Sequence, residues 1–85
     1  MRINLLYFAS VRETAGKSSE ILTLAQTPAT VATLQKVLST PPHPLATLLQ
    51  QQQNIKFAVN QKFANADTPL SDNCEVAIFP PVTGG

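Results

Sequence analysis

The stretch CEVAIFPP, residues 74–81, contains a short run of alternating apolar residues followed by two prolines. Side chains alternate along a strand, so this run is predicted to place Val76 and Ile78 on one face and Phe79 on the opposite face. Proline lacks the amide hydrogen that a β-ladder requires, and we therefore expect the strand to end before Pro80.

Two further strands are predicted near the N-terminus. Residues 2–8, RINLLYF, carry apolar side chains on both faces, which is typical of a strand inside a sheet. Residues 18–24, SSEILTL, are predicted to form a hairpin with that strand. The polar residues 10–17 include Gly16, and we interpret them as a long connection.

Residues 27–40, TPATVATLQKVLST, carry the signals of a helix. Thr30 is placed to cap the first amides. The prolines of residues 41–44, PPHP, end this helix, and residues 45–53 are predicted as a short second one. The apolar residues that recur at helical spacing in the first helix are Val31, Leu34, Val37 and Leu38.

The remaining elements complete a two-layer fold. Residues 55–60, IKFAVN, alternate as a half-buried strand, and residues 62–64 are a candidate for a further short strand. With the first and last strands parallel in the middle, the order predicts an α+β fold of the β-grasp (ubiquitin-like) type. We expect a mixed sheet of four to five strands on one main helix. Residues 1–85 would form a single domain, with residues 80–85 as a flexible, protruding tail.

Composition narrows the classes of function. The chain has 85 residues, 44% of them hydrophobic and 13% charged, with a net charge of +1 and no basic run. These values indicate an ordered globule without a nucleic-acid or membrane surface, and few charges are typical of a protein with a partner. No stretch is apolar enough to span a bilayer. A lone cysteine and the lack of a cleavage-like signal predict a cytoplasmic protein.

The sequence contains no pattern typical of an active site. His43 stands alone between prolines and is interpreted as a surface turn residue. We predict no metal site, because the His, Cys and carboxylate residues do not cluster along the chain. Cys74 is interpreted as a small apolar residue, since no basic activator lies near it in sequence.

The C-terminal tail is the remaining candidate for chemistry. Glycine has no Cβ, so Gly84 and Gly85 suit a backbone that enters a narrow channel. Pro80 and Pro81 restrict the stem, which lowers the entropy lost on insertion. The side chains of Val82 and Thr83 are placed to contact the mouth of such a channel. Two terminal glycines alone are more typical of a frayed chain end.

Three stretches resemble the small subunit of molybdopterin synthase, a family of ubiquitin-like sulfur carriers. They are YFASVRETAG (7–16), FAVNQ (57–61) and PLSDNCEVAIFPPVTGG (69–85). The chain departs from the family at Asn73-Cys74, where Gly-Asp is usual in the turn before the last strand. Asparagine tolerates a left-handed turn conformation, so we expect the turn to survive.

The resemblance implies a function for the tail. A separate ubiquitin-activating-like adenylyltransferase would use ATP to adenylate the Gly85 carboxylate, and a sulfur donor protein would convert it to a thiocarboxylate. The tail would then enter the large subunit of molybdopterin synthase and pass its sulfur to a pterin precursor. By this resemblance the chain binds no cofactor and supplies no catalytic groups, and two small and two large subunits assemble.

The resemblance also favours an interface with the large subunit. We predict that Phe8, Phe63 and Phe79 form an exposed apolar platform near the tail, because aromatic anchors are typical of interface centres. Arg12 is a candidate for a contact at the rim. The alternative is that one or more of these rings belongs to a small second core.

Other functions remain open at this point. Sulfur carriers for thiamine synthesis or tRNA thiolation share the fold and the two glycines, although FPPVTGG fits the first family better. A ubiquitin-like modifier would instead be joined to lysines through Gly85. A plain interaction module would have an idle tail.

Overall fold

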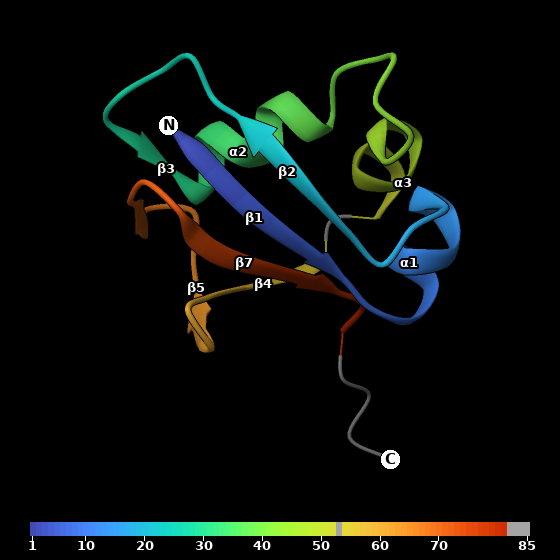
Figure 1. The fold of residues 1–85 in the computed structure, drawn as a ribbon. Helices are drawn as coiled ribbons and strands as arrows, with labels where there is room; N and C mark the ends of the chain where they lie inside the picture. The colour runs from blue at the N-terminus through green and yellow to red at the C-terminus, as the bar shows by residue number, and fades with distance from the viewer. Residues whose placement is uncertain (53, 82–85) are drawn as a thin grey trace.

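A computed structural model describes residues 1–52 and 54–81 of the chain. A helix follows the first strand, two helices precede the fourth strand, and β7 is the last strand (Figure 1). The elements are β1 (Arg2–Tyr7), α1 (Ala9–Ala15), β2 (Ser19–Thr23), β3 (Ala29–Thr30), α2 (Val31–Leu38), α3 (Ala46–Gln51), β4 (Lys56–Val59), β5 (Lys62–Ala64), β6 (Pro69–Leu70) and β7 (Cys74–Phe79).

The main sheet has five strands in the order β2-β1-β7-β4-β5. The first and last strands lie side by side and run parallel, with a register from Ile3 opposite Cys74 to Tyr7 opposite Ile78. All other pairs in this sheet are antiparallel. The predicted mixed β-grasp sheet with central β1 and β7 is therefore confirmed. A separate two-residue ladder between β3 and β6, which the sequence pattern did not predict, ties the entry of α2 to the chain before β7.

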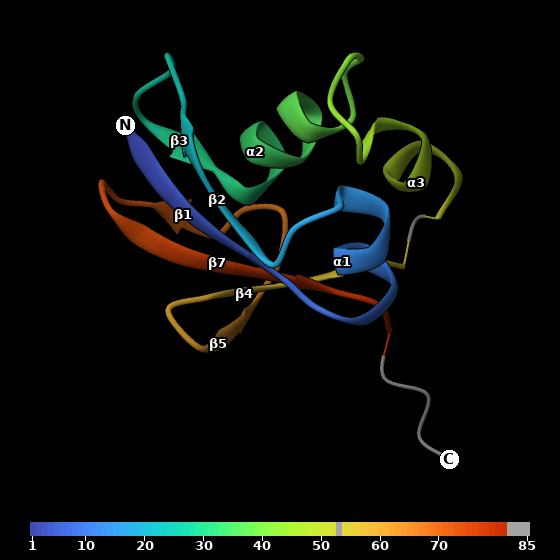
Figure 2. The same ribbon diagram turned by 45° about the vertical axis from the view of Figure 1, so that its right-hand side comes forward.

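The core lies between one face of the sheet and the helices (Figure 2). Alternate residues of the central strands point into it, and Leu34 and Leu38 of α2 cover them with no exposed surface. The buried residues contributed by β1 and β7 are Ile3, Leu5, Tyr7, Cys74, Val76 and Ile78. The burial of Val76 and Ile78 agrees with the alternation read from the sequence.

Helix α2 begins where its sequence predicts. The Thr30 hydroxyl accepts a hydrogen bond from the Thr33 amide, and the Thr33 hydroxyl accepts one from the Thr30 amide, forming a capping box. The prediction that Val37 shares one apolar face with Val31, Leu34 and Leu38 is wrong, because Val37 is 39% exposed while the others are buried. Val31, Leu34 and Leu38 already form a stripe at three- and four-residue spacing, and Val37 lies beyond its edge.

The predicted connection over residues 10–17 is wrong in its structure, because most of it is helix α1. Val11 and Ala15, four residues apart, are the only buried residues of this seven-residue helix. Gly16 ends it in a left-handed conformation with φ of 77°, and its amide donates to the Arg12 carbonyl. Two small apolar residues give too weak a periodic signal to separate such a helix from a polar loop.

The turn before β7 contains Asn73, where the sequence departs from the family pattern. Asn73 adopts φ of 66°, the left-handed conformation expected of it. Its amide donates to the Arg2 carbonyl, and the Asp72 carboxylate accepts from the Arg2 amide at 2.7 Å. These contacts align the start of β7 with the start of β1.

Helix α3 is shorter than the predicted 45–53. It spans Ala46–Gln51, with Leu45 and Leu49 buried. Residue 53 of the prediction lies outside the described residues. No helix within the described ranges is both long and apolar enough to cross a membrane.

The two faces of α2 predict different sensitivities to truncation. Leu38→Ala removes a fully buried side chain and is expected to lower the free energy of unfolding by about 2–5 kcal/mol. Val37→Ala, one residue away in the same helix, is the control and should cost less than about 1 kcal/mol. Urea unfolding of both variants tests this; equal losses would contradict the assignment of Val37 to the surface.

Candidate functional site

The platform residues lie on the side of the sheet that the helices do not cover. Tyr7 and Ile78 are paired in register and both point into the core. The next residue of each strand, Phe8 and Phe79, is therefore directed to the opposite face. The Phe8 amide donates to the Ile78 carbonyl at 3.1 Å, which continues the pairing to the point where β7 ends.

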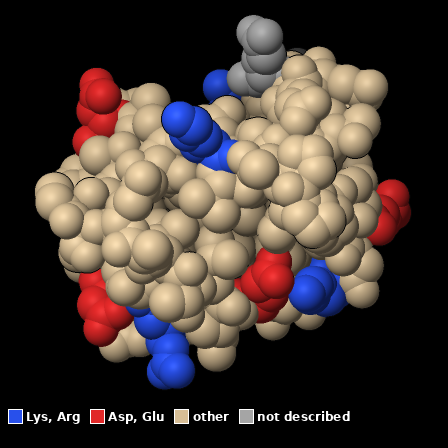
Figure 3. All heavy atoms as spheres, turned by 90° about the horizontal axis from the view of Figure 1, so that it is seen from above, with Lys and Arg blue, Asp and Glu red and all other residues tan. Residues whose placement is uncertain are grey.

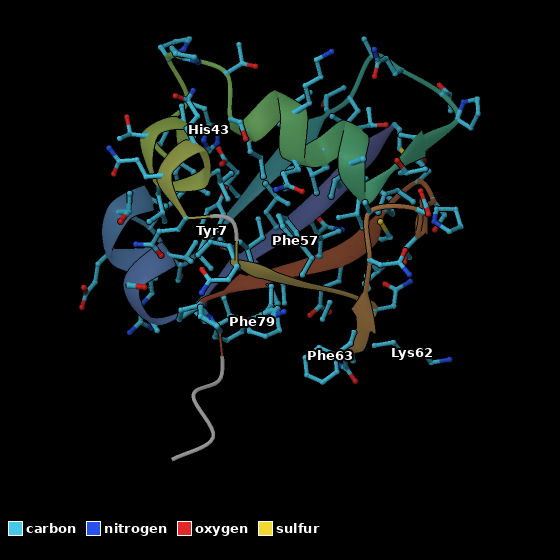
Figure 4. All side chains as sticks on the ribbon, turned by 180° about the vertical axis from the view of Figure 1, so that it is seen from behind. Tyr7, His43, Phe57, Lys62, Phe63 and Phe79 are labelled. Atoms are coloured by element: carbon cyan, nitrogen blue, oxygen red, sulfur yellow. The ribbon has the colours of Figure 1, made fainter. Side chains whose placement is uncertain are left out.

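Phe63 and Phe79 are in aromatic contact. Their ring centroids are 5.9 Å apart and their planes are tilted by 57°. Figure 4 shows both rings on the side of the sheet away from Phe57 and the helices. Phe63 is 80% exposed, whereas Phe79 is half-buried beneath it. This pair forms a contiguous aromatic surface on β5 and β7.

Phe8 stands apart from this pair. Within the residues that the structure describes, its ring makes no aromatic contact, and its side chain is 47% exposed. It occupies the N-cap position of α1, where the Arg12 amide donates to its carbonyl at 3.3 Å. Arg12 is exposed one turn further along the helix.

Further apolar residues, which the sequence analysis did not assign to a surface, complete the uncovered face. The register pairs Leu6 with Ala77, Ala58 with Ala77, and Asn4 with Ile21, so these residues share the face with the aromatic rings. Ile21, on the edge strand β2, is 63% exposed. We call the outer face the set Leu6, Phe8, Ile21, Ala58, Phe63, Ala77 and Phe79. The alternation of apolar residues along each strand is visible in the sequence. Only the register between the strands shows that these residues form one surface.

The stem of the tail leaves from this face. Pro80 and Pro81 follow Phe79 directly and are half-buried. Val82, Thr83, Gly84 and Gly85, which carry the predicted chemistry, lie outside the described residues. The outer face thus borders the point from which the tail departs.

A polar cluster around Glu20 lies on the helix side of the sheet. His43 belongs to this cluster and is not free on the surface. His43 is half-buried, and its Nε2 lies 3.0 Å from Glu20 Oε1. Its Nδ1 accepts a hydrogen bond from the Leu45 amide, so the neutral ring donates through Nε2. The Tyr7 hydroxyl donates to the same carboxylate oxygen, and Lys17 Nζ lies 3.2 Å from Oε2. The interpretation of His43 as a simple surface turn residue is therefore wrong.

The cluster changes the acidity of two of its members. Burial acts to raise the pKa of Glu20, but hydrogen bonds from Tyr7, His43 and Lys17 outweigh it, and the pKa is lowered overall. Burial, followed by the hydrogen bond to Glu20 and its charge, raises the pKa of the Tyr7 hydroxyl. Glu20 is thus held as a carboxylate that joins β1, β2 and the loop before α3, which is a structural role.

Cys74 and the acidic residues form no second site. The Cys74 side chain is buried and its thiol is not in a disulfide. Across residues 1–52 and 54–81, no group of three or more His, Cys, Asp or Glu side chains is arranged to hold a metal ion. On the face shown in Figure 3, the few charged side chains are scattered among uncharged ones, and some basic side chains lie beside acidic ones.

The parallel central strands, the helix across one face and the tail after β7 define the class of ubiquitin-like β-grasp proteins. The ThiS family matches residues 5–85, and the chain belongs to that family. The predicted resemblance to molybdopterin synthase small subunits is confirmed by relatives along the full length.

Two relatives illustrate this similarity. The molybdopterin synthase sulfur carrier subunit of Escherichia coli is 39% identical over 98% of this chain and 99% of its own. That of Chlamydomonas reinhardtii is 34% identical over the whole of both chains.

Solved structures agree on the fold. A putative molybdopterin converting factor subunit 1 from Pyrococcus furiosus has a TM-score of 0.80 at 25% identity, covering 96% of this chain and 99% of its own. A complex of subunits 1 and 2 of molybdopterin-converting factor from Helicobacter pylori contains a chain with a TM-score of 0.68 at 21% identity, covering all of both chains.

The Glu20 cluster predicts a pH-dependent loss of stability. Glu20→Gln removes a charged acceptor and should lower the free energy of unfolding by about 1 kcal/mol at neutral pH, since the group is partly solvated. The pKa of Glu20 is lower in the folded chain, so its contribution is present above the unfolded-state value and is lost as pH falls through the folded-state value. The difference in the free energy of unfolding between the wild-type chain and Glu20→Gln should therefore become smaller at acidic pH.

Urea unfolding at neutral and acidic pH measures this effect. Glu13→Gln is the matched control, because Glu13 is exposed on α1 and has no ion pair in the described part of the chain. A deficit of Glu20→Gln that stays constant with pH would contradict the role given to the carboxylate.

Proposed function

We propose that this chain is the sulfur-carrier subunit of a molybdopterin synthase, with a thiocarboxylate at Gly85 as the group it delivers. The observation that carries the proposal is the position of the exposed Phe63–Phe79 pair beside the Pro80–Pro81 stem. A surface that docks on a partner at this place directs the following four residues into that partner. The names of the full-length relatives and the Helicobacter pylori complex support the same function.

The part of the outer face around Phe63 and Phe79 has the properties of a docking surface. Phe63 exposes 80% of its side chain in a small protein with few charges, and this exposure costs free energy in water. A large subunit that covers the aromatic pair would recover that free energy, as buried aromatic anchors do in interfaces. The alternative that one or more of the rings belongs to a second core does not suit Phe8 or Phe63, because both are exposed.

The proposed chemistry takes place on the main chain. The Gly85 carboxylate attacks the α-phosphorus of ATP on the activating enzyme and releases pyrophosphate. A persulfide on the donor protein then attacks the acyl carbon and displaces AMP, which gives an acyl disulfide. A thiol reductant attacks the donor's sulfur and cleaves this S–S bond, leaving the thiocarboxylate at Gly85 and a disulfide between the reductant and the donor. Its sulfur is softer and less strongly hydrated than a carboxylate oxygen. It therefore attacks a carbon of the pterin precursor more readily, and the new C–S bond replaces a C–O bond whose oxygen leaves. Water then cleaves the acyl–sulfur bond and restores the carboxylate.

In this proposal the chain is a reagent, and the acid–base groups belong to its partners. His43 and Lys17 each already bond to Glu20, whose side chain lies on the helix side, away from the outer face. The small subunit would therefore need only a stable platform and an accessible chain end.

Removal of Gly85 tests the chemistry of the tail. The truncated chain should form no thiocarboxylate and transfer no sulfur, while its thermal unfolding stays unchanged, because the tail follows the last strand. Intact mass after incubation with ATP, the activating enzyme and a sulfur donor measures the product. In the wild-type chain, the mass should rise by the difference between sulfur and oxygen; protein-sized adducts would instead indicate a modifier.

Truncation of the aromatic pair tests the docking surface. Phe63→Ala and Phe79→Ala should each weaken binding of the purified large subunit by about tenfold or more, because central aromatic anchors contribute most to such interfaces. Phe63→Ala should leave the unfolding temperature nearly unchanged, as the ring is mostly exposed. Ile21→Ala, at the opposite edge of the same face, is the control. Unchanged binding of both phenylalanine variants would refute the platform.

A further inference from the structure

A recess lies beside the aromatic pair, at the end of the β4–β5 hairpin. It has a volume of about 370 Å³ and is lined by Lys56, Phe57, Phe63 and Ala64. Phe63 is both a wall of this recess and a partner of Phe79 in the aromatic contact. The recess is therefore continuous with the surface proposed for docking.

Lys56 brings a positive charge to the centre of this region. It lies opposite Phe79 in the pairing of β4 with β7, and shares the outer side of β4 with Ala58, the register partner of Phe63. The lysine is exposed, and in the described part of the chain no carboxylate pairs with it. None of the residues that line the recess is acidic.

The neighbouring lysine is placed differently. Lys62 is paired in register with Val59, which puts it on the opposite side of the hairpin from Phe63. Figure 4 shows its side chain directed away from the Phe63 ring. The hairpin therefore carries two exposed lysines, of which Lys56 alone borders the recess.

Docking on the aromatic pair would place Lys56 in a poorly solvated position. A cation that is removed from water without an opposite charge costs several kcal/mol, so a partner that binds tightly here must supply an anion. The apolar walls from Phe57, Phe63 and Ala64 favour an apolar side chain beside that anion.

We propose that the recess between Lys56 and Phe63 receives an apolar side chain of the large subunit, with an adjacent carboxylate that pairs with Lys56. This inference rests on the proposed function, because the large subunit is its occupant. It makes Lys56 a residue that selects the partner by charge, in addition to the aromatic anchors that provide apolar contact.

Neutralising substitutions test the charge directly. Lys56→Met keeps most of the apolar stem and removes the charge, and should weaken binding of the purified large subunit by about tenfold. Lys56→Glu should weaken it by about a hundredfold, because it sets two carboxylates against each other. Lys62→Met and Lys62→Glu are the matched controls on the same hairpin and should change the affinity by less than about threefold. Titration calorimetry measures the affinities, and thermal unfolding checks that the variants fold.

The results of these binding measurements distinguish a failure of the Lys56 inference from a failure of the proposed sulfur-carrier function. If the wild-type chain binds the large subunit and Phe63→Ala weakens that binding, unchanged or tighter binding by Lys56→Met overturns the inference and leaves the function standing. Equal losses for the Lys56 and Lys62 variants overturn it as well, because they indicate a general charge effect. Failure of the wild-type chain to bind the large subunit refutes the proposed function itself.

Discussion

The parallel pairing of β1 with β7 is the constraint on which the rest of the structure depends. It brings the two ends of the chain together in the middle of the sheet and sets Tyr7 opposite Ile78 in the core. A shift of this register by one residue would exchange the two faces of a strand, burying Phe8 or Phe79 and exposing core side chains. The same pairing therefore determines the core, the uncovered face and the point where the tail leaves.

The pairing is held in place at both ends. At one end, Arg2 exchanges hydrogen bonds with Asp72 and Asn73, which aligns the start of β7. At the other end, the Tyr7 hydroxyl donates a hydrogen bond to the Glu20 carboxylate, which also bonds to His43 and Lys17. The cluster of Tyr7, Lys17, Glu20 and His43 thus stabilises the sheet from the side opposite the aromatic pair.

The arrangement separates stability from function. The helices and the inner sides of the strands supply the core, whereas the outer face contributes little to it: Phe63 and Ile21 remain largely exposed. Aromatic and charged residues on that face are free to serve a partner without loss of the fold. In the proposed function the partner is a protein that encloses the tail, and the face sets the position from which the tail enters.

The sequence by itself determined the order of the main-sheet strands around α2, the shared face of Val76 and Ile78, and the cap of α2 at Thr30, because these depend on local periodicity and local hydrogen bonds. It also singled out Phe63 and Phe79 from alternation and family resemblance. Local patterns did not reveal α1, whose two small buried residues give a weak signal, nor did they exclude Val37 from the core. Only the tertiary structure decided that His43 meets Glu20 and that Lys56 lies opposite Phe79 and lines a recess with Phe63. Contacts across 23 residues or between paired strands depend on register and packing.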